Sequence, residues 1–364
     1  MKVAIIHYWL IGMRGGEKVL EDICSIYPDA DIYTHIYDQN KVSSFLNSFT
    51  IKTTFINSLP FSNKIHSIYL PLMPLALKFL NLKSYDLIIS SEAGPSKGVH
   101  KHQAKHVCYC HSPMRYIWDM YSIYYKNSSI MNKIALRIFR KPLRKWDIKS
   151  SYNLDLIIAN SSFVSIRIKN YWKKDSIIIN PGIDMDLFSI SDNKKNYYLI
   201  VSELVQYKKI DLAIDAFNLN KKELYIIGKG PMLDKYKQKA NQNITFLGPV
   251  TNQIRNKYLS ECKGLIFPGI EDFGIVPLEA MASGIPVLAF NFGGIKDYLI
   301  NGVNGITFKN QTAESLNNCI KYFEKNINKF DPLEIRKSIS KFTTDNFKNI
   351  FKTNINNILK NDKN

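Results

Sequence analysis

The chain has 364 residues, is 45% hydrophobic by composition and carries a formal net charge of +18 at pH 7. This length and apolar content suit a large core, which two domains accommodate better than one. The positive charge favours acidic partners such as nucleic acid, an anionic membrane face or phosphorylated small molecules. The five cysteines are scattered and odd in number, which excludes a disulfide framework and fits a reducing cytosol.

The apolar stretch at the N-terminus is too short for a secretory signal peptide, and acidic residues follow it too closely. No run of about 18 apolar residues occurs, so the sequence predicts no transmembrane helix. We therefore expect a cytoplasmic protein, with peripheral attachment to the inner face of the plasma membrane as a further possibility that depends on the basic segment described below.

Residues 2–8 predict a buried strand, and a helical pattern covers residues 17–26. Between them lie Gly12, Gly15 and Gly16. A strand, a glycine turn and a helix in this order open many α/β nucleotide-binding domains. The glycines do not form a GxGxxG motif, so close chain packing explains them about as well as phosphate contact does.

Further strands alternate with helical stretches, which predicts mostly parallel sheets covered on both faces. The apolar segment 68–82 is interrupted by Pro71, Pro74 and Lys78. It favours a buried helix over a segment that dips into a membrane near a lipid-linked acceptor. The strands predicted in the first half are residues 31–37, 51–56, 86–90, 106–110, 155–160 and 176–180.

A run of histidines and cysteines, HKHQAKHVCYCH, occupies residues 100–111. Imidazole and thiolate groups are good ligands for zinc. The second half alternates like a strand, which places Cys108 and Cys110 on one face that His106 and His111 do not share cleanly. There is no CxxC pair and no second cluster, so a metal site is disfavoured and we expect no metal cofactor.

The next segment, HSPMRYIWD, covers residues 111–119. His111 ends a strand at the carboxyl edge of the expected sheet, which is where open α/β sheets bind ligands. Arg115 fits contact with a phosphate or an acidic group about as well as a structural salt bridge. Trp118 is better explained by packing than by binding an acceptor.

Residues 126–174 contain twelve Lys or Arg and two acidic residues. Part of this segment, KIALRIFRKPLRKWDIK, has helical spacing. A solvated helix face and a surface that docks onto anionic lipid both explain the excess charge. Nucleic-acid binding is not expected, because no known binding module is present. The basic residues assigned to one helix face are Arg137, Arg140, Lys141, Arg144 and Lys145.

The second half repeats the strand and helix pattern. A proline-glycine turn in residues 180–184 and a polar stretch at residues 189–196 predict the domain boundary. We therefore expect an N-terminal domain at residues 1–188, a second α/β domain at 189–340 and C-terminal helical residues at 341–364. Strands are predicted at residues 197–202, 223–228 and 243–248.

Residues 267–287, FPGIEDFGIVPLEAMASGIPV, form the most informative stretch. They predict a strand end, a loop, a helix that starts at Pro277 and a buried strand. Glu271 lies in the loop and Glu279 in the expected first helical turn, and Gly274 between them allows close approach of a ligand. Free amides at a helix start suit phosphate, and carboxylates suit sugar hydroxyls.

These motifs resemble glycosyltransferase family 4, whose members are retaining enzymes with the two-domain GT-B fold. The match rests on EDFGIVPLEAMASGIPV, with two glutamates separated by seven residues, and on IIGKGP and FNFGGIKDYLINGVNGITF. The segment CHSPMRYIWD is similar to one in family 4 mannosyltransferases of bacterial surface-polysaccharide assembly, such as O-antigen synthesis. The resemblance covers nearly the whole chain and is strongest over residues 197–308.

The resemblance implies a role for each matched residue. Glu279 would hold the ribose hydroxyls and Glu271 the hydroxyls of the donor sugar. A histidine at the position of His111 lies against that sugar, so His111 and Glu271 are the expected catalytic pair, and Arg115 is an acceptor or phosphate candidate. The expected donor-binding residues are Gly15, Gly16, Lys208, Lys209, Asp272, Phe273, Gly274, Ile275, Val276 and Glu279.

Lys208 matches a family lysine that clamps the donor diphosphate. Many members carry an arginine at the position of Glu203, and its absence here leaves Lys208 and Lys209 with more phosphate charge to neutralise. The resemblance also implies that the last helix, in residues 341–364, crosses back to the first domain.

The implied activity is transfer of a sugar from a nucleotide-sugar donor to a lipid-linked or growing glycan, with GDP-mannose as the preferred donor. No metal is expected, because electrostatic stabilisation of the departing diphosphate replaces it. One alternative is the same transferase with a UDP-sugar donor. Another is an inactive transferase-like subunit that only binds glycan, although Glu271, Glu279, Lys208 and His111 are all present.

Overall fold

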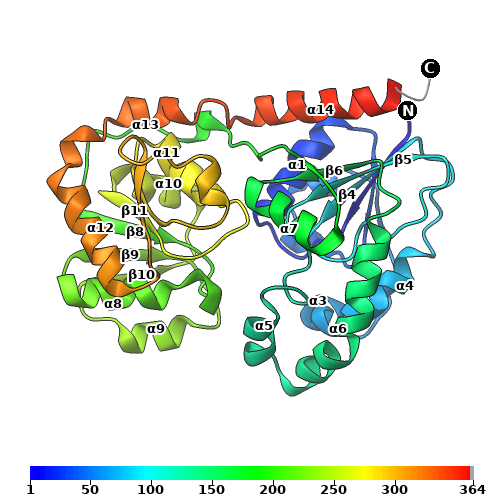
Figure 1. The fold of residues 1–364 in the computed structure, drawn as a ribbon, viewed down its shortest axis with the longest axis horizontal. Coiled ribbons are helices and arrows are strands. Elements are labelled where there is room, and N and C mark those ends of the chain that lie inside the picture. Colours follow the sequence, from blue (N-terminus) through cyan, green and yellow to red (C-terminus); the bar gives the residue numbers. More distant parts are fainter. Residues whose placement is uncertain (361–364) are drawn as a thin grey trace. The chain divides into compact units, whose positions relative to one another are not determined.

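The computed structural model describes residues 1–360 and divides into two compact units. Unit 1 comprises Met1–Pro181 together with the C-terminal residues from Asp345 onward, and unit 2 comprises Gly182–Thr344. Each unit contains one parallel sheet flanked by helices (Figure 1). The expected α/β class with two such domains is therefore confirmed.

The sheet of unit 1 has the strand order β3-β2-β1-β4-β5-β6-β7, and all neighbouring strands are parallel. Its strands are β1 (Val3–His7), β2 (Asp31–Thr34), β3 (Ile51–Thr53), β4 (Leu87–Glu92), β5 (Lys105–Cys110), β6 (Leu156–Ala159) and β7 (Ile177–Ile178). Its helices are α1 (Gly15–Ile26), α2 (Ser44–Asn47), α3 (Ser62–Ile65), α4 (Met73–Leu77), α5 (Tyr121–Asn127), α6 (Ile130–Ser150), α7 (Ser162–Trp172) and α14 (Thr344–Lys360).

Both faces of the unit 1 sheet are buried. In β1, Val3 and Ile5 pack into the core beneath α1, whereas Ala4 and Ile6 belong to a second core on the opposite face. This is the period-two alternation of a strand, here with apolar residues in both registers because helices cover both faces. The continuous apolar pattern of β1 follows from that environment.

Helix α14 lies beside α1 in unit 1 (Figure 1). Phe347, Phe351 and Ile355 recur at intervals of four residues and are all buried in the same core as α1. The ring centroids of Phe347 and Phe351 lie 5.7 and 6.1 Å from that of Tyr109 on β5. Helix α14 is therefore part of the hydrophobic core of unit 1.

The division between the units lies where two passages of the chain run side by side. Ile183 N donates to Phe342 O at 2.9 Å, and Thr344 N donates to Ile183 O at 3.1 Å. The boundaries expected at residues 188 and 340 both lie inside unit 2. The polar stretch 189–196 is also part of unit 2, because Lys195 N donates to Glu261 O at 2.8 Å.

The sheet of unit 2 has the order β10-β9-β8-β11-β12-β13 and is also parallel. Its strands are β8 (Tyr197–Val201), β9 (Glu223–Ile227), β10 (Ile244–Gly248), β11 (Gly264–Phe267), β12 (Val287–Phe290) and β13 (Gly305–Phe308). Its helices are α8 (Ile210–Asn220), α9 (Leu233–Lys239), α10 (Asn252–Glu261), α11 (Ile275–Ala282), α12 (Ala313–Lys325) and α13 (Pro332–Ser338).

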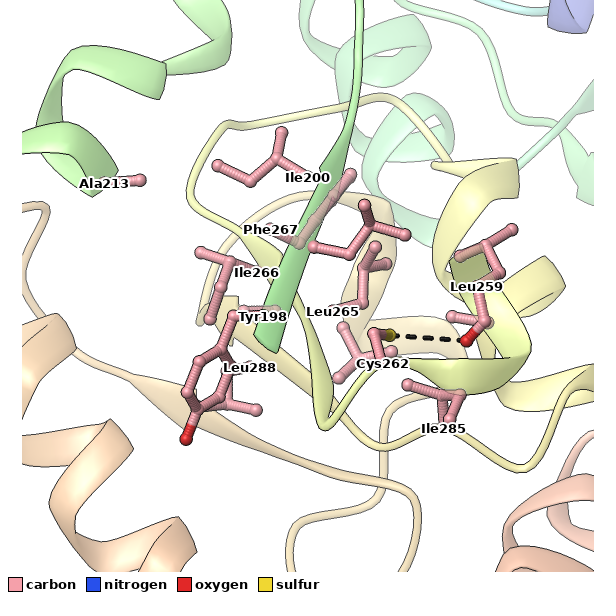
Figure 2. Close-up of a cluster of buried hydrophobic side chains, with 14 of the residues drawn as sticks. Tyr198, Ile200, Ala213, Leu259, Cys262, Leu265, Ile266, Phe267, Ile285 and Leu288 are labelled. Carbon is pink, nitrogen blue, oxygen red and sulfur yellow. Dashed lines mark hydrogen bonds between the residues drawn. The ribbon is translucent and has the colours of Figure 1, made fainter. Parts of the chain in front are cut away.

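The core of unit 2 centres on strands β8, β11 and β12. Figure 2 shows Tyr198 and Ile200 of β8, Leu265 and Ile266 of β11 and Leu288 of β12 gathered in one apolar cluster. Cys262 donates its thiol hydrogen to Leu259 O at 3.3 Å and is a buried free cysteine (Figure 2). This packing fixes the strands whose carboxyl ends carry the loops described below.

The strand order reverses at one point in each sheet. In unit 1 the reversal lies between β1 and β4, and in unit 2 between β8 and β11. Connections after these neighbouring strands leave in opposite directions, so a crevice forms outside their carboxyl ends. We therefore expect ligand-binding residues directly after His7, Glu92, Val201 and Phe267.

The apolar segment 68–82 does not form one helix. It forms a 3-10 segment η3 (His66–Leu72), followed by the short α4, because Pro71 and Pro74 interrupt the regular hydrogen bonding. Met73, Ala76 and Leu77 are buried, whereas Leu75 and Phe79 are exposed. Among residues 1–360, no helix is both long enough and apolar enough to cross a membrane.

Truncating the buried face of α14 should destabilise unit 1. We expect Phe351→Ala to lower the free energy of unfolding by about 3–5 kcal/mol, because a large aromatic side chain is lost from a packed core. Denaturant-induced unfolding followed by circular dichroism measures this change.

The matched control is Ile350→Ala, because Ile350 is the adjacent residue of the same helix and is 41% exposed. Its effect should stay within about 1 kcal/mol. Equal destabilisation by both variants would show that α14 does not contribute to the core in the way described.

Candidate functional site

The crevice of unit 2 is bordered by two loops that follow β8 and β11. The first loop leads through the 3-10 turn η5 (Gln206–Lys208) into α8, and the second covers residues 268–274 and leads into α11. Lys208, Gly269 and Glu271 line the same pocket, together with residues of β8 and β11. The structure therefore brings two of the predicted site residues, Lys208 and Glu271, to one place.

Lys208 Nζ and Glu271 Oε1 form an ion pair. Their side chains are only 15% and 24% exposed, so water screens this pair incompletely. Gly269 is required beside it, because a Cβ at that position would lie 2.9 Å from Lys208 Cα. The close approach of two loops thus positions a positive and a negative group at the edge of the sheet.

The loop 268–274 ends in the first turn of α11. Gly274 has φ +86° and directly precedes the first helical residue, Ile275, so the helix starts earlier than the predicted Pro277. A side chain at Gly274 would also meet the Phe267 ring and the Tyr298 hydroxyl at 3.0 Å. The glycine conformation begins the helix here, and the predicted start at Pro277 was wrong for that reason.

Tyr298 holds the backbone that directly precedes α11 through its hydroxyl group. Its hydroxyl lies 2.5 Å from Gly274 O and 3.1 Å from Phe273 O, so it donates to the backbone of the loop. Burial raises the pKa of Tyr298 well above its usual range, and Glu271 and Asp297 raise it further. The hydroxyl therefore keeps its proton and remains a donor.

The backbone of the loop also packs against a glycine pair in the turn before η6 (Gly294–Asp297). Gly294 N donates to Glu271 O at 2.9 Å. A Cβ at Gly293 would lie 2.6 Å from Glu271 O, and one at Gly294 would lie 2.2 Å from Asp272 O. The loop that carries the acidic residues is thus held by direct backbone contact.

Glu279 lies in the second turn of α11, and not in the first turn as predicted, because the helix begins at Ile275. Its side chain is 3% exposed, and its Oε1 lies 3.4 Å from the guanidinium of Arg255 on α10. The guanidinium compensates part of the buried negative charge. Between Glu279 and the loop, Ile275 and Val276 are partly exposed on the first turn of α11.

Lys209 adopts the left-handed conformation with φ +55° and directly precedes α8. It lines a second hollow with Asp211, Asp215 and Gln311, whereas Lys208 lines the pocket with Glu271. The two neighbouring lysines therefore border different hollows.

In unit 1, His111 follows the last residue of β5 and is 9% exposed. Its backbone N donates to Glu92 O at 2.8 Å, and its Nε2 lies 2.8 Å from Ser91 Oγ. Both partners belong to the end of β4, at the reversal of strand order. His111 thus lies at the carboxyl edge of the sheet, as the sequence predicts.

The other predicted residues of unit 1 occupy nearby turns. Gly15 and Gly16 are the first residues of α1, and a Cβ at Gly16 would lie 3.1 Å from the Tyr8 hydroxyl. Arg115 is partly buried, and its backbone carbonyl accepts hydrogen bonds from Trp118 N and Met120 N. It therefore belongs to the turn between β5 and α5.

Two of the basic residues in α6 have structural roles. Arg140 Nε and Arg144 Nε donate to Ile117 O at 3.2 and 2.7 Å. The guanidinium of Arg144 also lies 4.5 Å from the ring centroid of Trp118. Arg140 and Arg144 therefore hold the segment that follows His111, whereas Arg137, Lys141 and Lys145 are exposed.

The histidine and cysteine run is distributed over separate environments. Cys108 and Cys110 are buried free thiols, and burial raises the pKa of both well above the usual range. His106 Nε2 lies 2.6 Å from Ser90 Oγ, and burial lowers its pKa to about 3. Within residues 1–360, no group of three or more His, Cys, Asp or Glu side chains is arranged to hold a metal ion.

Sequence reasoning missed Arg255, Tyr298 and Ser91. Arg255 and Tyr298 act on residues 24 positions away in sequence, and no local pattern marks such contacts. Ser91 did carry a signal, because it stands at the end of a predicted strand beside the point where ligands bind.

Two family models match the sequence. The model described as "Glycosyltransferase Family 4" matches residues 13–187, and the model described as "Glycosyl transferases group 1" matches residues 187–342. The first match includes strands β2 to β7 of unit 1, and the second includes the whole sheet of unit 2, the loop 268–274 and helix α11. They confirm the resemblance that the motifs indicated.

Curated relatives include eukaryotic mannosyltransferases. The chain is 25% identical to the alpha-1,3/1,6-mannosyltransferase ALG2 of Dictyostelium discoideum over 319 residues, which covers 73% of this chain and 72% of that protein. It is 24% identical to the alpha-1,3/1,6-mannosyltransferase alg2 of Schizosaccharomyces pombe over 370 residues, which covers 84% of this chain and 70% of that protein.

Solved structures share the fold. Sucrose-phosphate synthase from Thermosynechococcus elongatus superimposes with a TM-score of 0.74 at 18% identity, covering 98% of this chain and 99% of that one. Anabaena HepE in complex with UDP superimposes with a TM-score of 0.72 at 16% identity, covering 98% of this chain and 100% of that one. The two-sheet architecture is therefore that of the GT-B fold.

The hydroxyl of Tyr298 should stabilise the loop before α11. We expect Tyr298→Phe to lower the free energy of unfolding of unit 2 by about 1 kcal/mol, because buried backbone carbonyls lose their donor. Hydrogen exchange of the amides in residues 271–276 should become faster.

Tyr322→Phe is the matched control, because Tyr322 is 57% exposed. If Tyr298→Phe left both stability and amide exchange at the level of this control, the proposed support of the loop would be contradicted.

Proposed function

Because the chain belongs to glycosyltransferase family 4, we propose that it transfers mannose from GDP-mannose to a lipid-linked or growing surface glycan with retention of anomeric configuration. The observation that carries this proposal is the Lys208–Glu271 pair at the strand reversal of unit 2, beside the first turn of α11. A nucleotide-sugar has a diphosphate and sugar hydroxyls, and the pair offers one complementary group for each.

In the proposed reaction the donor diphosphate exchanges with Glu271 as the partner of Lys208. The lysine then neutralises charge on the leaving group, and the amides at the start of α11 assist because a helix N-terminus attracts anions. Glu271, no longer paired, accepts hydrogen bonds from hydroxyls of the donor sugar. Glu279 binds the ribose, which requires its carboxylate to share Arg255 with that ligand.

His111, at the carboxyl edge of the unit 1 sheet, is the second catalytic residue that the family resemblance implies. The acceptor attacks on the side from which the diphosphate leaves, so no protein nucleophile is required and the configuration is retained. Positive charge from Lys208 and the helix amides stabilises the departing diphosphate. The reaction therefore needs no divalent metal, and we expect turnover to persist with excess chelator.

Mannose is preferred as the transferred sugar because the named relatives are mannosyltransferases. A UDP-sugar donor is the second candidate, because Anabaena HepE was solved in complex with UDP-glucose. The acceptor is proposed by analogy with enzymes of surface-polysaccharide assembly. An inactive glycan-binding subunit is disfavoured because Lys208 and Glu271 are present and placed together.

Removing either member of the pair should abolish most turnover. We expect Lys208→Ala and Glu271→Ala to lower the rate of GDP release from GDP-mannose at least a hundredfold, or about 2.7 kcal/mol of transition-state stabilisation. Steady-state kinetics with and without excess chelator measures both the loss and the metal requirement.

The controls Lys257→Ala and Glu314→Ala remove the same groups from exposed positions of unit 2 and should leave the rate unchanged. Near-normal turnover of the Lys208 and Glu271 variants would remove this pair from the active site. Complete loss of activity with chelator would contradict the metal-free mechanism.

The proposal includes docking onto an anionic membrane surface through α6. Ile130, Ile134 and Ile138 form an apolar row along this helix, with exposed fractions of 77%, 55% and 59%. Residues four apart lie on one helix face, so the three side chains project together. Isolated apolar residues are ordinary on a surface, but an ordered row on an amphipathic helix is typical of interfacial binding.

A basic row lies next to the apolar row. Arg137, Lys141 and Lys145 are exposed and also recur every four residues. Each residue follows a member of the apolar row by three or seven positions, so the two rows are neighbours around the helix. The combination fits a bilayer with anionic headgroups, since the apolar row enters the interface while the basic row meets the charge.

Reversing charge in the basic row should weaken membrane binding. We expect Arg137→Glu combined with Lys141→Glu to lower affinity for vesicles of phosphatidylglycerol and phosphatidylcholine by at least about tenfold, because each basic group contributes on the order of 1 kcal/mol. Vesicle flotation at low and high salt measures this effect.

The double variant Lys235→Glu and Lys237→Glu makes the same charge change on exposed positions of α9 and should bind like the wild type. Vesicle binding that does not change with salt concentration or with the charge of the lipid would contradict the docking proposal.

A further inference from the structure

Five large apolar side chains of unit 1 are exposed on the segment that links β3 to β4. The segment folds into η2 (Phe55–Ser58), α3, η3 and α4, and its inward residues, among them Met73 and Leu77, are buried. The outward residues are apolar as well, so the segment carries more apolar surface than the core of unit 1 buries. We call the exposed set the apolar surface. It consists of Phe55, Phe61, Leu72, Leu75 and Phe79, which are 42%, 69%, 42%, 47% and 71% exposed.

Local structure holds three of these rings at the surface. Phe61 has φ +53°, a left-handed conformation that bulky residues rarely adopt. Its carbonyl accepts hydrogen bonds from Lys64 N and Ile65 N at 2.8 and 3.0 Å. Phe55 and Phe79 come from separate turns, and their ring centroids lie 6.1 Å apart in an edge-to-face arrangement. An unfavourable backbone conformation that is kept at an exposed phenylalanine indicates a functional constraint on that position.

The apolar surface adjoins the apolar row of α6. Helix α6 packs against η3, and Asn132 Nδ2 of α6 donates to Ser67 Oγ of η3 at 3.3 Å. Asn132 lies between Ile130 and Ile134, the first two members of the apolar row. Figure 1 shows α3, α4 and α6 in one region of unit 1. Exposed apolar residues from two neighbouring parts of the chain are therefore grouped, and grouped apolar residues mark an interaction site.

The charge of the segment complements an anionic surface. Residues 39–85 contain five lysines and no Asp or Glu. Lys64 of α3 and Lys78 at the end of α4 are both exposed, and Lys78 directly precedes Phe79. Lysine side chains reach charged headgroups while their apolar neighbours enter the acyl chains. An anionic bilayer offers both kinds of group, because hydrocarbon lies directly beneath its headgroups.

We propose that the apolar surface inserts into the hydrocarbon edge of an anionic bilayer together with the apolar row of α6. Unit 1 then docks through two adjoining parts of the chain. This inference deepens the docking described for α6 and rests on that part of the proposed function. It also gives residues 68–82 the membrane-dipping role that the sequence left as the less favoured alternative. A lipid-linked acceptor is anchored in the same bilayer and is thereby brought to unit 1.

Fluorescent labels at single positions test insertion directly. The five native cysteines are buried, so an environment-sensitive nitrobenzoxadiazole label reacts with one introduced cysteine. With vesicles of phosphatidylglycerol and phosphatidylcholine, we expect the label in Phe61→Cys and in Phe79→Cys to shift its emission to the blue. Doxyl groups on the acyl chains should quench that emission. Leu219→Cys is the matched control, because Leu219 is 71% exposed on α8 of unit 2, and its emission should not change.

Loss of apolar side chains gives a second readout. We expect Leu75→Asp combined with Phe79→Asp to lower vesicle affinity at least about tenfold, because burial of apolar side chains drives interfacial binding. Both positions are exposed, so the fold should persist. The control Leu219→Asp combined with Leu333→Asp places the same groups on exposed positions of unit 2 and should bind vesicles like the wild type.

The outcomes separate this surface from the rest of the proposed function. Labels at residues 61 and 79 that stay in water while the protein still binds vesicles would overturn insertion and confine docking to α6. A dimer that Phe79→Asp dissociates, measured by analytical ultracentrifugation, would assign the surface to a second copy of this chain and also overturn the inference. Insertion without any binding of GDP would contradict the proposed transferase while supporting the membrane surface.

Discussion

Parallel pairing with a single reversal of strand order is the constraint on which the rest of the structure depends. It leaves one crevice at the carboxyl edge of each sheet, between β1 and β4 and between β8 and β11. In unit 2 this edge holds Lys208 and Glu271, and in unit 1 it holds the hydrogen-bonded residues Ser91 and His111. The buried strands fix the positions of the loops, and residues at the strand ends and in the loops provide the functional side chains.

Buried charge supports this arrangement in unit 1. Lys97 Nζ lies 3.0 Å from Glu92 Oε1 and is also paired with Asp147, and all three side chains are completely buried. Burial alone would lower the pKa of Lys97, but Asp147 and Glu92 outweigh it and raise the pKa, so the lysine is charged. Removing one member of such a cluster costs about 3–5 kcal/mol, which fixes the end of β4 beside Ser91.

The sequence predicted the fold class, the family and the loop that carries Glu271, because each depends on local spacing. It placed the start of α11 at Pro277 and so misplaced Glu279, because the left-handed conformation of Gly274 is decided by contacts with Phe267 and Tyr298. The contact of Arg255 with Glu279 and that of Arg140 with Ile117 O were not predictable either, since both depend on how separate elements pack. Sequence motifs identified the functional residues, whereas tertiary packing determined which residues contact them.

We propose that the strand reversal of unit 2 binds a nucleoside diphosphate through Lys208. Calorimetric titration of the wild type and Lys208→Ala with GDP, UDP, ADP and dTDP tests it most directly. We predict selective binding of GDP that weakens at least about tenfold in the variant, since a charged hydrogen bond contributes about 1.5–3 kcal/mol. Selective UDP binding with the same loss would keep the site and change the donor. No binding of any diphosphate, or equal binding by the variant, would contradict this role of Lys208.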